Sequence, residues 1–326
     1  PHITNEIKRR IKILSKKDYD IIITEIGGTV GDIESLPYIE SVRQLQWELG
    51  KNNSMVIHLT LLPYLSSSGE LKTKPSQHSV RQLMESGIQA DVLVCRTEHS
   101  IPKDLRAKLA QFCNVGLDNV IECIDMDTIY EVPLYLQKQN FDEVVLKELN
   151  LPVGKDVNLK DWKSFLKKYK NPKKSVEIAL VGKYVSLQDS YKSIAEAFIH
   201  AGADLETEVN VRWVYSGDIE TEGAEKLLKG VDGILVAPGF GDRGIEGKIQ
   251  AAKYARENKV PLLGICLGMQ IMTIEFARNV LGLAKANSME FDTSTPDPVI
   301  SLMEEQKNVV EKGGTMRLGA WKCALK

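Results

Sequence analysis

The sequence has 326 residues, of which 43% are hydrophobic and 26% are charged, a balance typical of a globular protein that can bury two cores. Its 42 Lys and Arg against 44 Asp and Glu leave a net charge of -2, which argues against general binding to nucleic acid or anionic membrane. No apolar run reaches the roughly 18 to 20 residues that span a bilayer, and the start, PHITNEIKRRIK, lacks the apolar core of a signal peptide. We therefore expect a cytoplasmic protein.

The first half of the sequence alternates short β-branched runs with longer amphipathic stretches. The runs predict four strands, at residues 19–26, 55–62, 91–95 and 119–124. Apolar residues recur at helical spacing from Leu36 to Leu49, between the first two strands. This alternation predicts an α/β domain over residues 1–150, with a parallel sheet and crossover helices.

The pattern then lapses between residues 151 and 175, which are rich in Lys and contain no strand-like run. We interpret this stretch as an interdomain linker with one short amphipathic helix from about Trp162 to Tyr169. The alternative is a surface excursion within a single domain.

A second alternation begins at Val176 and predicts a second doubly wound α/β domain over residues 176–326. Its expected strands are residues 176–182, 209–214, 232–239 and 261–266. Its expected helices are residues 190–202, 223–230, 244–258 and 269–282.

The stretch Gly264-Ile265-Cys266-Leu267-Gly268-Met269-Gln270 follows the last of these strands and opens a helix. A strand, Gly-x-Cys-x-Gly and a helix form the pattern of a nucleophile elbow, in which glycines permit a tight turn. A thiol at a helix N-terminus is favoured as the thiolate, and the Leu267 N–H is placed to donate to an oxyanion. The pattern indicates that Cys266 is a nucleophile. The alternative is a buried structural thiol, the usual fate of a free Cys.

A second oxyanion donor is expected at Gly239, in the glycine-rich turn after the strand that ends near Ala237. Loops that follow parallel strands meet at the carboxyl edge of the sheet, so both donors are predicted to lie together. The same turn spells Gly-x-Gly-x-x-Gly, but it lies late in its domain and no acid follows where a ribose ligand is needed, so it is not a dinucleotide site.

Longer motifs carry a resemblance to a known family. GICLGMQ, APGFGDRG, NSMEF and GGTMRLG resemble the class I glutamine amidotransferase domain of the CTP synthase family. EIGGTVGDIES, SGELKTKPSQHSV, CRTEH and DMDTIYEVP resemble its synthetase domain. The resemblance implies a flavodoxin-like glutaminase domain and a P-loop-type synthetase domain, here without its N-terminal phosphate loop.

For the glutaminase domain, the resemblance implies that Cys266 forms a thioester with the side chain of L-glutamine and releases ammonia. It assigns glutamine and oxyanion contacts to Gly239, Leu267, Gly268, Met269, Gln270 and Glu290. Unaided, Glu290 is most simply a solvated acid.

For the synthetase domain, the resemblance implies ATP- and Mg²⁺-dependent amination of UTP to CTP, the last step of de novo CTP synthesis, with no organic cofactor. It assigns UTP or CTP binding to Lys72, Thr73, Lys74, Pro75, Ser76, Gln77 and Lys108. It assigns ATP binding to Arg96, Ile124, Asp125 and Met126, and feedback by CTP to Asp32, Ile33 and Glu34. It places Glu25 as a metal ligand and Lys192 in coupling between domains, and it implies a homotetramer activated by GTP.

Two parts of the family pattern are absent from the sequence. No glycine-rich phosphate loop precedes the first strand, and all five histidines precede Cys266, so none matches the family's late His that acts as base. We expect truncation at both ends, with the base beyond Lys326, and poor glutamine turnover because general-base help is worth about a hundred- to ten-thousandfold. The alternatives are another glutaminase-coupled synthetase, a γ-glutamyl hydrolase, or a non-catalytic nucleotide-binding or filament-forming module.

Overall fold

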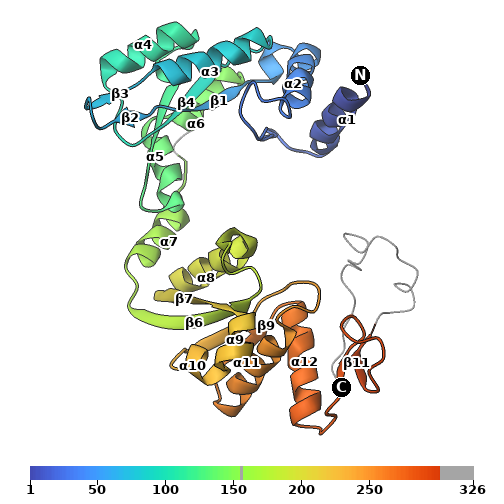
Figure 1. Cartoon of the computed structure of the whole chain (residues 1–326). Helices are drawn as coiled ribbons and strands as arrows, with labels where there is room; N and C mark the ends of the chain where they lie inside the picture. Colours follow the sequence, from blue (N-terminus) through green and yellow to red (C-terminus); the bar gives the residue numbers. More distant parts are fainter. Residues whose placement is uncertain (155–156, 302–326) are drawn as a thin grey trace. The chain divides into compact units, whose positions relative to one another are not determined.

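The structure is a computed structural model that describes residues 1–154 and 157–301, so the GGTMRLG motif lies outside the described residues. The chain divides into two compact units, Pro1–Asn158 and a second that begins at Leu159 (Figure 1). Within the described residues, no helix combines the length and apolar character needed to cross a membrane.

The first unit is an α/β structure built on a small parallel sheet. Its strands are β1 (Ile57–Leu61), β2 (Tyr64–Leu65), β3 (Glu70–Leu71), β4 (Val92–Thr97) and β5 (Val120–Ile124). Its α-helices are α1 (His2–Ile11), α2 (Leu36–Leu49), α3 (Lys74–Glu85), α4 (Lys103–Cys113), α5 (Val132–Lys138) and α6 (Phe141–Glu148). The main sheet has the order β1-β4-β5, and β2 and β3 form a separate antiparallel pair.

Alternate residues of β4 face two different cores. Leu93 and Cys95 pack with side chains of α3 and α4, whereas Val92 and Val94 pack with side chains of α5 and α6. This two-sided burial explains why the strand is almost continuously apolar, as parallel strands covered on both faces must be. The predicted parallel sheet with crossover helices is confirmed.

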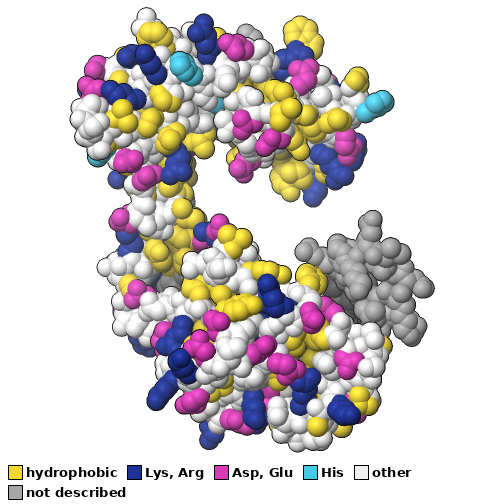
Figure 2. All heavy atoms as spheres, viewed as in Figure 1, with side chains coloured by type: hydrophobic (Ala, Val, Ile, Leu, Met, Phe, Trp, Pro, Cys, Tyr) yellow, Lys and Arg dark blue, Asp and Glu magenta, His cyan; other side chains and the backbone are white. Residues whose placement is uncertain are grey.

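The strand predicted at residues 19–26 is wrong. The segment is irregular, and Ile23 is 90% exposed. A run of β-branched residues forms a strand only when a neighbouring strand satisfies its backbone groups, and no described strand pairs with this segment. Figure 2 shows further hydrophobic side chains at the surface of the first unit around α1 and α2, where Trp47 is 88% exposed.

The second unit is a larger doubly wound α/β structure. Its strands are β6 (Lys174–Gly182), β7 (Thr207–Tyr215), β8 (Gly233–Val236), β9 (Leu262–Gly264), β10 (Asn287–Ser288) and β11 (Pro298–Ile300). Its α-helices are α7 (Lys160–Lys170), α8 (Lys192–Asp204), α9 (Ser216–Glu222), α10 (Ala224–Leu228), α11 (Ile245–Glu257) and α12 (Leu267–Asn279).

The main sheet of this unit is parallel and has the order β7-β6-β8-β9. In chain order this is 2-1-3-4, the start of the flavodoxin-like arrangement, whose ligands bind where the winding reverses beside the first strand. Ala179 and Val181 of β6 pack with α9, α10 and α11, and Leu180 packs with α8. Helices therefore cover both faces, and the loops after β6, β8 and β9 open at one edge.

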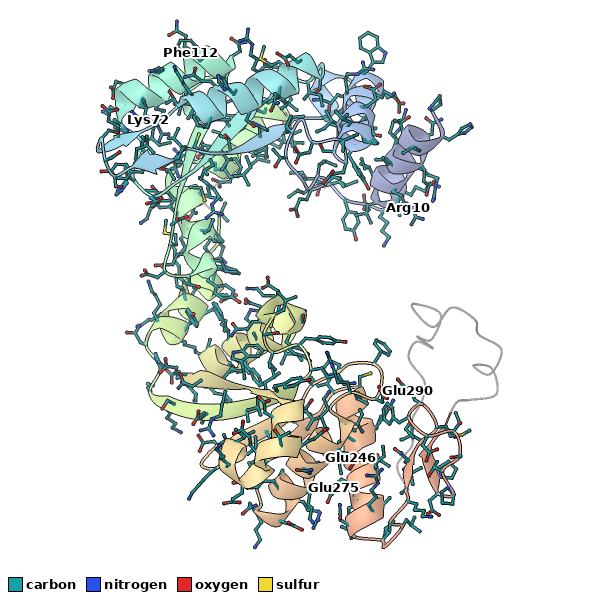
Figure 3. All side chains as sticks on the ribbon, in the orientation of Figure 1. Arg10, Lys72, Phe112, Glu246, Glu275 and Glu290 are labelled. Carbon is teal, nitrogen blue, oxygen red and sulfur yellow. The ribbon has the colours of Figure 1, made fainter. Side chains whose placement is uncertain are left out.

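A partly buried ion pair joins the exposed Arg256 of α11 to the buried Glu275 of α12. The carboxylate of Glu275 (Figure 3), a residue only 3% exposed, accepts from Arg256 Nη2 at 2.8 Å and Nε at 3.0 Å. The exposed Glu257 contacts the same guanidinium at 3.4 Å.

We expect Glu275→Gln to lower the free energy of unfolding by about 1 to 3 kcal/mol, because it weakens the pairing of a charge that α11 and α12 partly bury. Glu257→Gln is the matched control and should cost less than about 0.5 kcal/mol, since exposed pairs contribute little. Urea unfolding of both variants gives the comparison. Equal losses would contradict this interpretation.

Candidate active site

Cys266 lies at the tip of a strained turn between β9 and α12. Its φ of 53° and ψ of -106° are unusual for a residue with a side chain, and its side chain is exposed. Backbone strain of this kind costs on the order of 1 to 3 kcal/mol and is found mainly at functional sites. The geometry is that of a nucleophile elbow. The alternative of a buried structural thiol is wrong.

Glycines on both sides make the turn possible. A Cβ atom at Gly268 would overlap the carbonyl oxygen of Val236, and a Cβ atom at Gly264 would lie 2.6 Å from Met269 N. The absence of side chains therefore lets the start of α12 pack directly on the ends of β8 and β9. Because α12 begins at Leu267, the N–H of this residue has no acceptor within the helix and remains available to an oxyanion.

The predicted second donor is close to the elbow. Ala237 N donates to Val181 O at 2.9 Å and Ile265 N donates to Val236 O at 3.1 Å, so the sheet ladder sets the turn after β8 beside Cys266. A Cβ atom at Gly239 would lie 3.8 Å from Leu267 Cδ2, so Gly239 lies against the side chain of the first residue of α12. Both glycine-rich segments thus meet at the carboxyl edge, as the sequence predicted.

Two polar side chains predicted to bind glutamine also border this region. Glu290 Oε1 accepts from Gly241 N at 3.3 Å, and Figure 3 shows Glu290 on the side of the unit where α12 begins. Gln270, in the first turn of α12, has a buried Oε1 with no hydrogen-bond partner among the described residues. Buried acceptors are nearly always paired, so this oxygen has spare capacity for a ligand donor. Met269 is 53% exposed beside it. Their roles stay predictions.

No histidine of the described chain forms a hydrogen bond with Cys266. His200 packs edge-on against Phe165, and His99 packs edge-on against Tyr64. His58 Nε2 lies 2.9 Å from Ser79 Oγ, and burial lowers its pKa. These three rings have other partners, and the conclusion that the base is not among the five histidines stays a prediction.

The free thiols differ sharply in accessibility, which gives a labelling prediction. Cys95 and Cys113 have no exposed surface, and burial raises the pKa of Cys95 to about 12 and that of Cys113 to about 11. Because only the thiolate reacts, native protein treated with iodoacetamide at pH 8 should be alkylated at Cys266 and not at these two. Peptide mass spectrometry with and without urea checks this. Labelling of Cys95 or Cys113 in native protein as fast as Cys266 would contradict it.

In the first unit, the residues predicted to bind UTP or CTP gather at the start of α3. Lys74 and Pro75 are exposed there, while Ser76 is buried and its Oγ donates to Leu61 O at 3.0 Å, tying α3 to the end of β1. Gln77 Nε2 donates to Thr73 Oγ1 at 3.0 Å. Ser76 therefore has a structural role within this segment, and its contact with a nucleotide stays a prediction.

Two further lysines predicted to bind pyrimidine nucleotides are placed differently. Lys72 (Figure 3) pairs with Glu70 at 2.6 Å, next to the short strand β3. Lys108 is exposed on α4. A ligand phosphate would compete with Glu70 for Lys72, and such an exposed pair is weak enough to be exchanged.

The residues predicted to bind ATP lie at the ends of β4 and β5. Arg96 Nη2 donates to Asp125 Oδ1 at 2.9 Å, which brings the two predicted segments together. Ile124 ends β5, and Met126 is partly buried just beyond it. These ends share the carboxyl edge of the sheet with Leu61 and the start of α3, so the predicted nucleotide residues occupy one edge.

Three other predictions fall on exposed positions. Asp32, Ile33 and Glu34 form an exposed turn before α2, in which Ser35 N donates to Asp32 O at 3.1 Å. Lys192 begins α8 and pairs with Glu196 at 3.4 Å. Glu25 is exposed in the irregular segment, so it does not end a strand as expected. No group of three or more His, Cys, Asp or Glu suited to a metal occurs among the described residues.

Sequence reasoning missed two buried lysines next to the elbow. Lys183 follows β6 and is 5% exposed, and Lys248, in α11, has no exposed surface. A signal for Lys248 was present, because it shares helical spacing with the apolar stripe of Ala251, Ala252 and Ala255. A lysine on such a stripe predicts a buried ammonium group.

Comparison with known families agrees with this geometry. The family "Glutamine amidotransferase class-I" matches residues 186–325, and the second unit is a glutamine amidotransferase domain of this class. The family "CTP synthase N-terminus" matches residues 1–151. A CTP synthase of Flavobacterium johnsoniae is 64% identical over 327 residues, and one of Flavobacterium psychrophilum is 65% identical over 326 residues. The chain belongs to the CTP synthase family.

Both alignments cover 100% of this chain and 61% of the relative, so the chain spans 61% of the length of these curated relatives. A solved structure described as "Trypanosoma brucei CTPS - glutaminase domain with bound acivicin" is 37% identical, covering 43% of this chain and 60% of that chain. Its TM-score is 0.39.

Proposed function

We propose that the second unit hydrolyses the side-chain amide of L-glutamine through Cys266. The observation that carries this is the strained elbow, which holds an exposed thiol at a helix N-terminus beside the Gly239 turn. Sγ attacks the amide carbon, and the N–H groups of Leu267 and Gly239 donate to the oxygen that becomes negative. The C–N bond of this adduct then breaks, the nitrogen takes a proton from water and leaves as ammonia, and water hydrolyses the remaining thioester to glutamate and the free thiol. Glu290 suits the substrate's α-ammonium group by charge.

We further propose that the first unit binds UTP and ATP at the carboxyl edge of its sheet, and that the complete reaction converts UTP to CTP with ammonia from glutamine. Lys72, Lys74 and Lys108 supply positive charge for phosphates. Mg²⁺, when bound with ATP, would neutralise phosphate charge. Glu25 is kept from the family resemblance as a proposed oxygen ligand, although it lies in the irregular segment and not at a strand end; Mg²⁺ is usually held by one or two carboxylates together with phosphates and water.

Regulation and assembly are part of the same proposal and come from the family resemblance. They comprise feedback by CTP at the turn Asp32–Glu34, activation by GTP, a homotetramer, and coupling of the units through Lys192. The exposure of that turn and of Lys192 is compatible with contact to a ligand or to another unit.

The test is a graft of residues 1–326 into the 64%-identical relative in place of the segment that they match. We expect the graft to convert UTP to CTP with either glutamine or free ammonia as nitrogen donor. Loss of only the glutamine reaction in Cys266→Ala would support two separate sites. Conversion with neither donor would contradict the proposal, and would favour a binding or filament-forming module.

A further inference from the structure

Lys183 and Lys248 bury two ammonium groups at the carboxyl edge of one sheet. Lysine is almost never fully buried unless it is paired, because the effective cost of removing an ammonium group from water is several kcal/mol. Neither residue forms an ion pair within the part of the chain that the structure describes. No direct ion pair therefore accounts for their burial, although the carboxylates of Asp242 and Glu290 act on Lys183 from farther away.

Both side chains donate to backbone carbonyl groups of a single turn, residues 237–241. Lys248 Nζ donates to Ala237 O at 2.7 Å. Lys183 Nζ donates to Phe240 O at 2.9 Å and also to Gly241 O. The two lysines come from different elements, α11 and the end of β6, and hold the turn at its two ends.

Between the held carbonyl groups lie Pro238 and Gly239. Proline fixes its own φ near -65°, so the direction of the Gly239 N–H depends mainly on Pro238 ψ and Gly239 φ. Fixing the Ala237 and Phe240 carbonyl groups limits both angles. The stem of Lys183 also closes one side, because a Cβ atom at Gly239 would lie 3.8 Å from Lys183 Cδ.

We propose that Lys183 and Lys248 are positioning residues, whose ammonium groups hold the turn at residues 237–241 so that the Gly239 N–H faces the carbonyl oxygen attacked by Cys266. The inference rests on the proposed glutaminase function and names a part of that site. Charge-assisted hydrogen bonds to carbonyl oxygens are roughly twice as strong as neutral ones, which suits a rigid donor.

The surroundings of Lys248 are consistent with this role. Burial and, to a lesser extent, the nearby Lys183 together lower the pKa of Lys248 to about 8, while Cys266 acts in the opposite direction. An amine with this pKa is mostly protonated at pH 7. No described hydrogen bond joins Lys248 to Cys266, so Lys248 acts through the turn and not as a base.

The test compares two reactions of the same thiol. An activated γ-glutamyl p-nitrophenyl ester acylates Cys266: a C–S bond forms, the C–O bond breaks, p-nitrophenolate leaves with the bonding pair, and the thiol proton goes to solvent. This path passes through an oxyanion but needs no protonation of the leaving group. Iodoacetamide alkylates the same thiol by displacing iodide at a saturated carbon, without an oxyanion.

We expect Lys248→Met to lower the rate of acylation at saturating ester about 10- to 1,000-fold, where the upper limit is the effect of losing one oxyanion donor. The ester concentration that gives half of the maximal rate should not change. Alkylation should stay within about twofold of wild type. Thermal stability should be unchanged or higher, since replacing a buried charge by an apolar side chain of similar length is often stabilising. Lys183→Met should have the same effects on acylation, alkylation and stability. It replaces Lys248→Met in the test if that variant does not fold.

The matched control is Lys253→Met, an exposed lysine of the same helix, which should change neither reaction. Unchanged acylation in both buried-lysine variants would overturn the inference, as would an equal fall in acylation and alkylation. Failure of the proposed function is distinguishable, because wild-type protein would then be acylated no faster than Cys266→Ser.

Discussion

Cys266→Ser is expected to abolish glutamine-dependent CTP formation in the grafted enzyme while ammonia-dependent formation continues. A serine hydroxyl at the elbow is not ionised near neutral pH, whereas the thiolate is the reactive form of cysteine. Loss of the catalytic nucleophile lowers turnover by roughly a millionfold in an unrelated triad protease. The comparison of rates with glutamine and with ammonia measures the effect.

The matched control is Cys123→Ser, which alters a partly buried thiol at the end of β5 and should leave both rates within about twofold. Ammonia-dependent synthesis reports on the first unit, so it also shows that the serine variant is folded there. Glutamine-dependent synthesis that persists in Cys266→Ser would exclude Cys266 as the nucleophile.

Much of the second unit could be predicted because its signals are local. The strand expected at residues 176–182 is found as β6, Lys174–Gly182, and the helix expected from residue 244 to residue 258 is found as α11, Ile245–Glu257. Both follow from the spacing of apolar side chains, which reports directly on buried faces. The elbow is equally local, since strand, glycine, cysteine, glycine and helix are contiguous.

The strand predicted at residues 19–26 is wrong because strand pairing, unlike the spacing of apolar side chains, is not a local property of the sequence. Three consecutive isoleucines satisfy every local requirement of a buried strand, yet Ile23 is 90% exposed. Pairing depends on a partner that the segment's own sequence does not specify. For the same reason the role of Lys183 could not be predicted. Its side chain extends from the end of β6 to a turn more than fifty residues later in the chain, and no local sequence pattern connects the two positions.

The residues predicted to bind glutamine and nucleotides could be predicted only in part. Their place at the carboxyl edge follows from strand order and was predictable. Individual contacts were not, as Ser76 shows: its hydroxyl is used to tie α3 to Leu61. Glycine positions are more informative, because the backbone contacts around them can be read without knowing any ligand.

Gly268→Ala is expected to be the most destabilising single change at the elbow, with a loss of about 3 kcal/mol or more in the unfolding free energy of the second unit. The new Cβ would overlap Val236 O and lie 3.0 Å from Val236 C. Both are backbone atoms of β8, and overpacking against atoms that cannot rotate away costs about 1 to 3 kcal/mol or more. Because Val236 immediately precedes the turn at residues 237–241, the same displacement should move the Gly239 N–H and slow acylation of Cys266.

The control is Gly239→Ala, where the nearest atoms, Leu267 Cδ2 and Lys183 Cδ, lie at an ordinary contact distance of 3.8 Å. It should cost less than about 1 kcal/mol, because no backbone must shift. Hydrogen exchange of the amides of β8 and α12 in the two variants localises the effect to the second unit, where a whole-chain melting curve would mix both units. Equal protection in Gly268→Ala and Gly239→Ala would show that β8 and α12 can separate without cost, and would remove the physical basis for a preorganised oxyanion site between them.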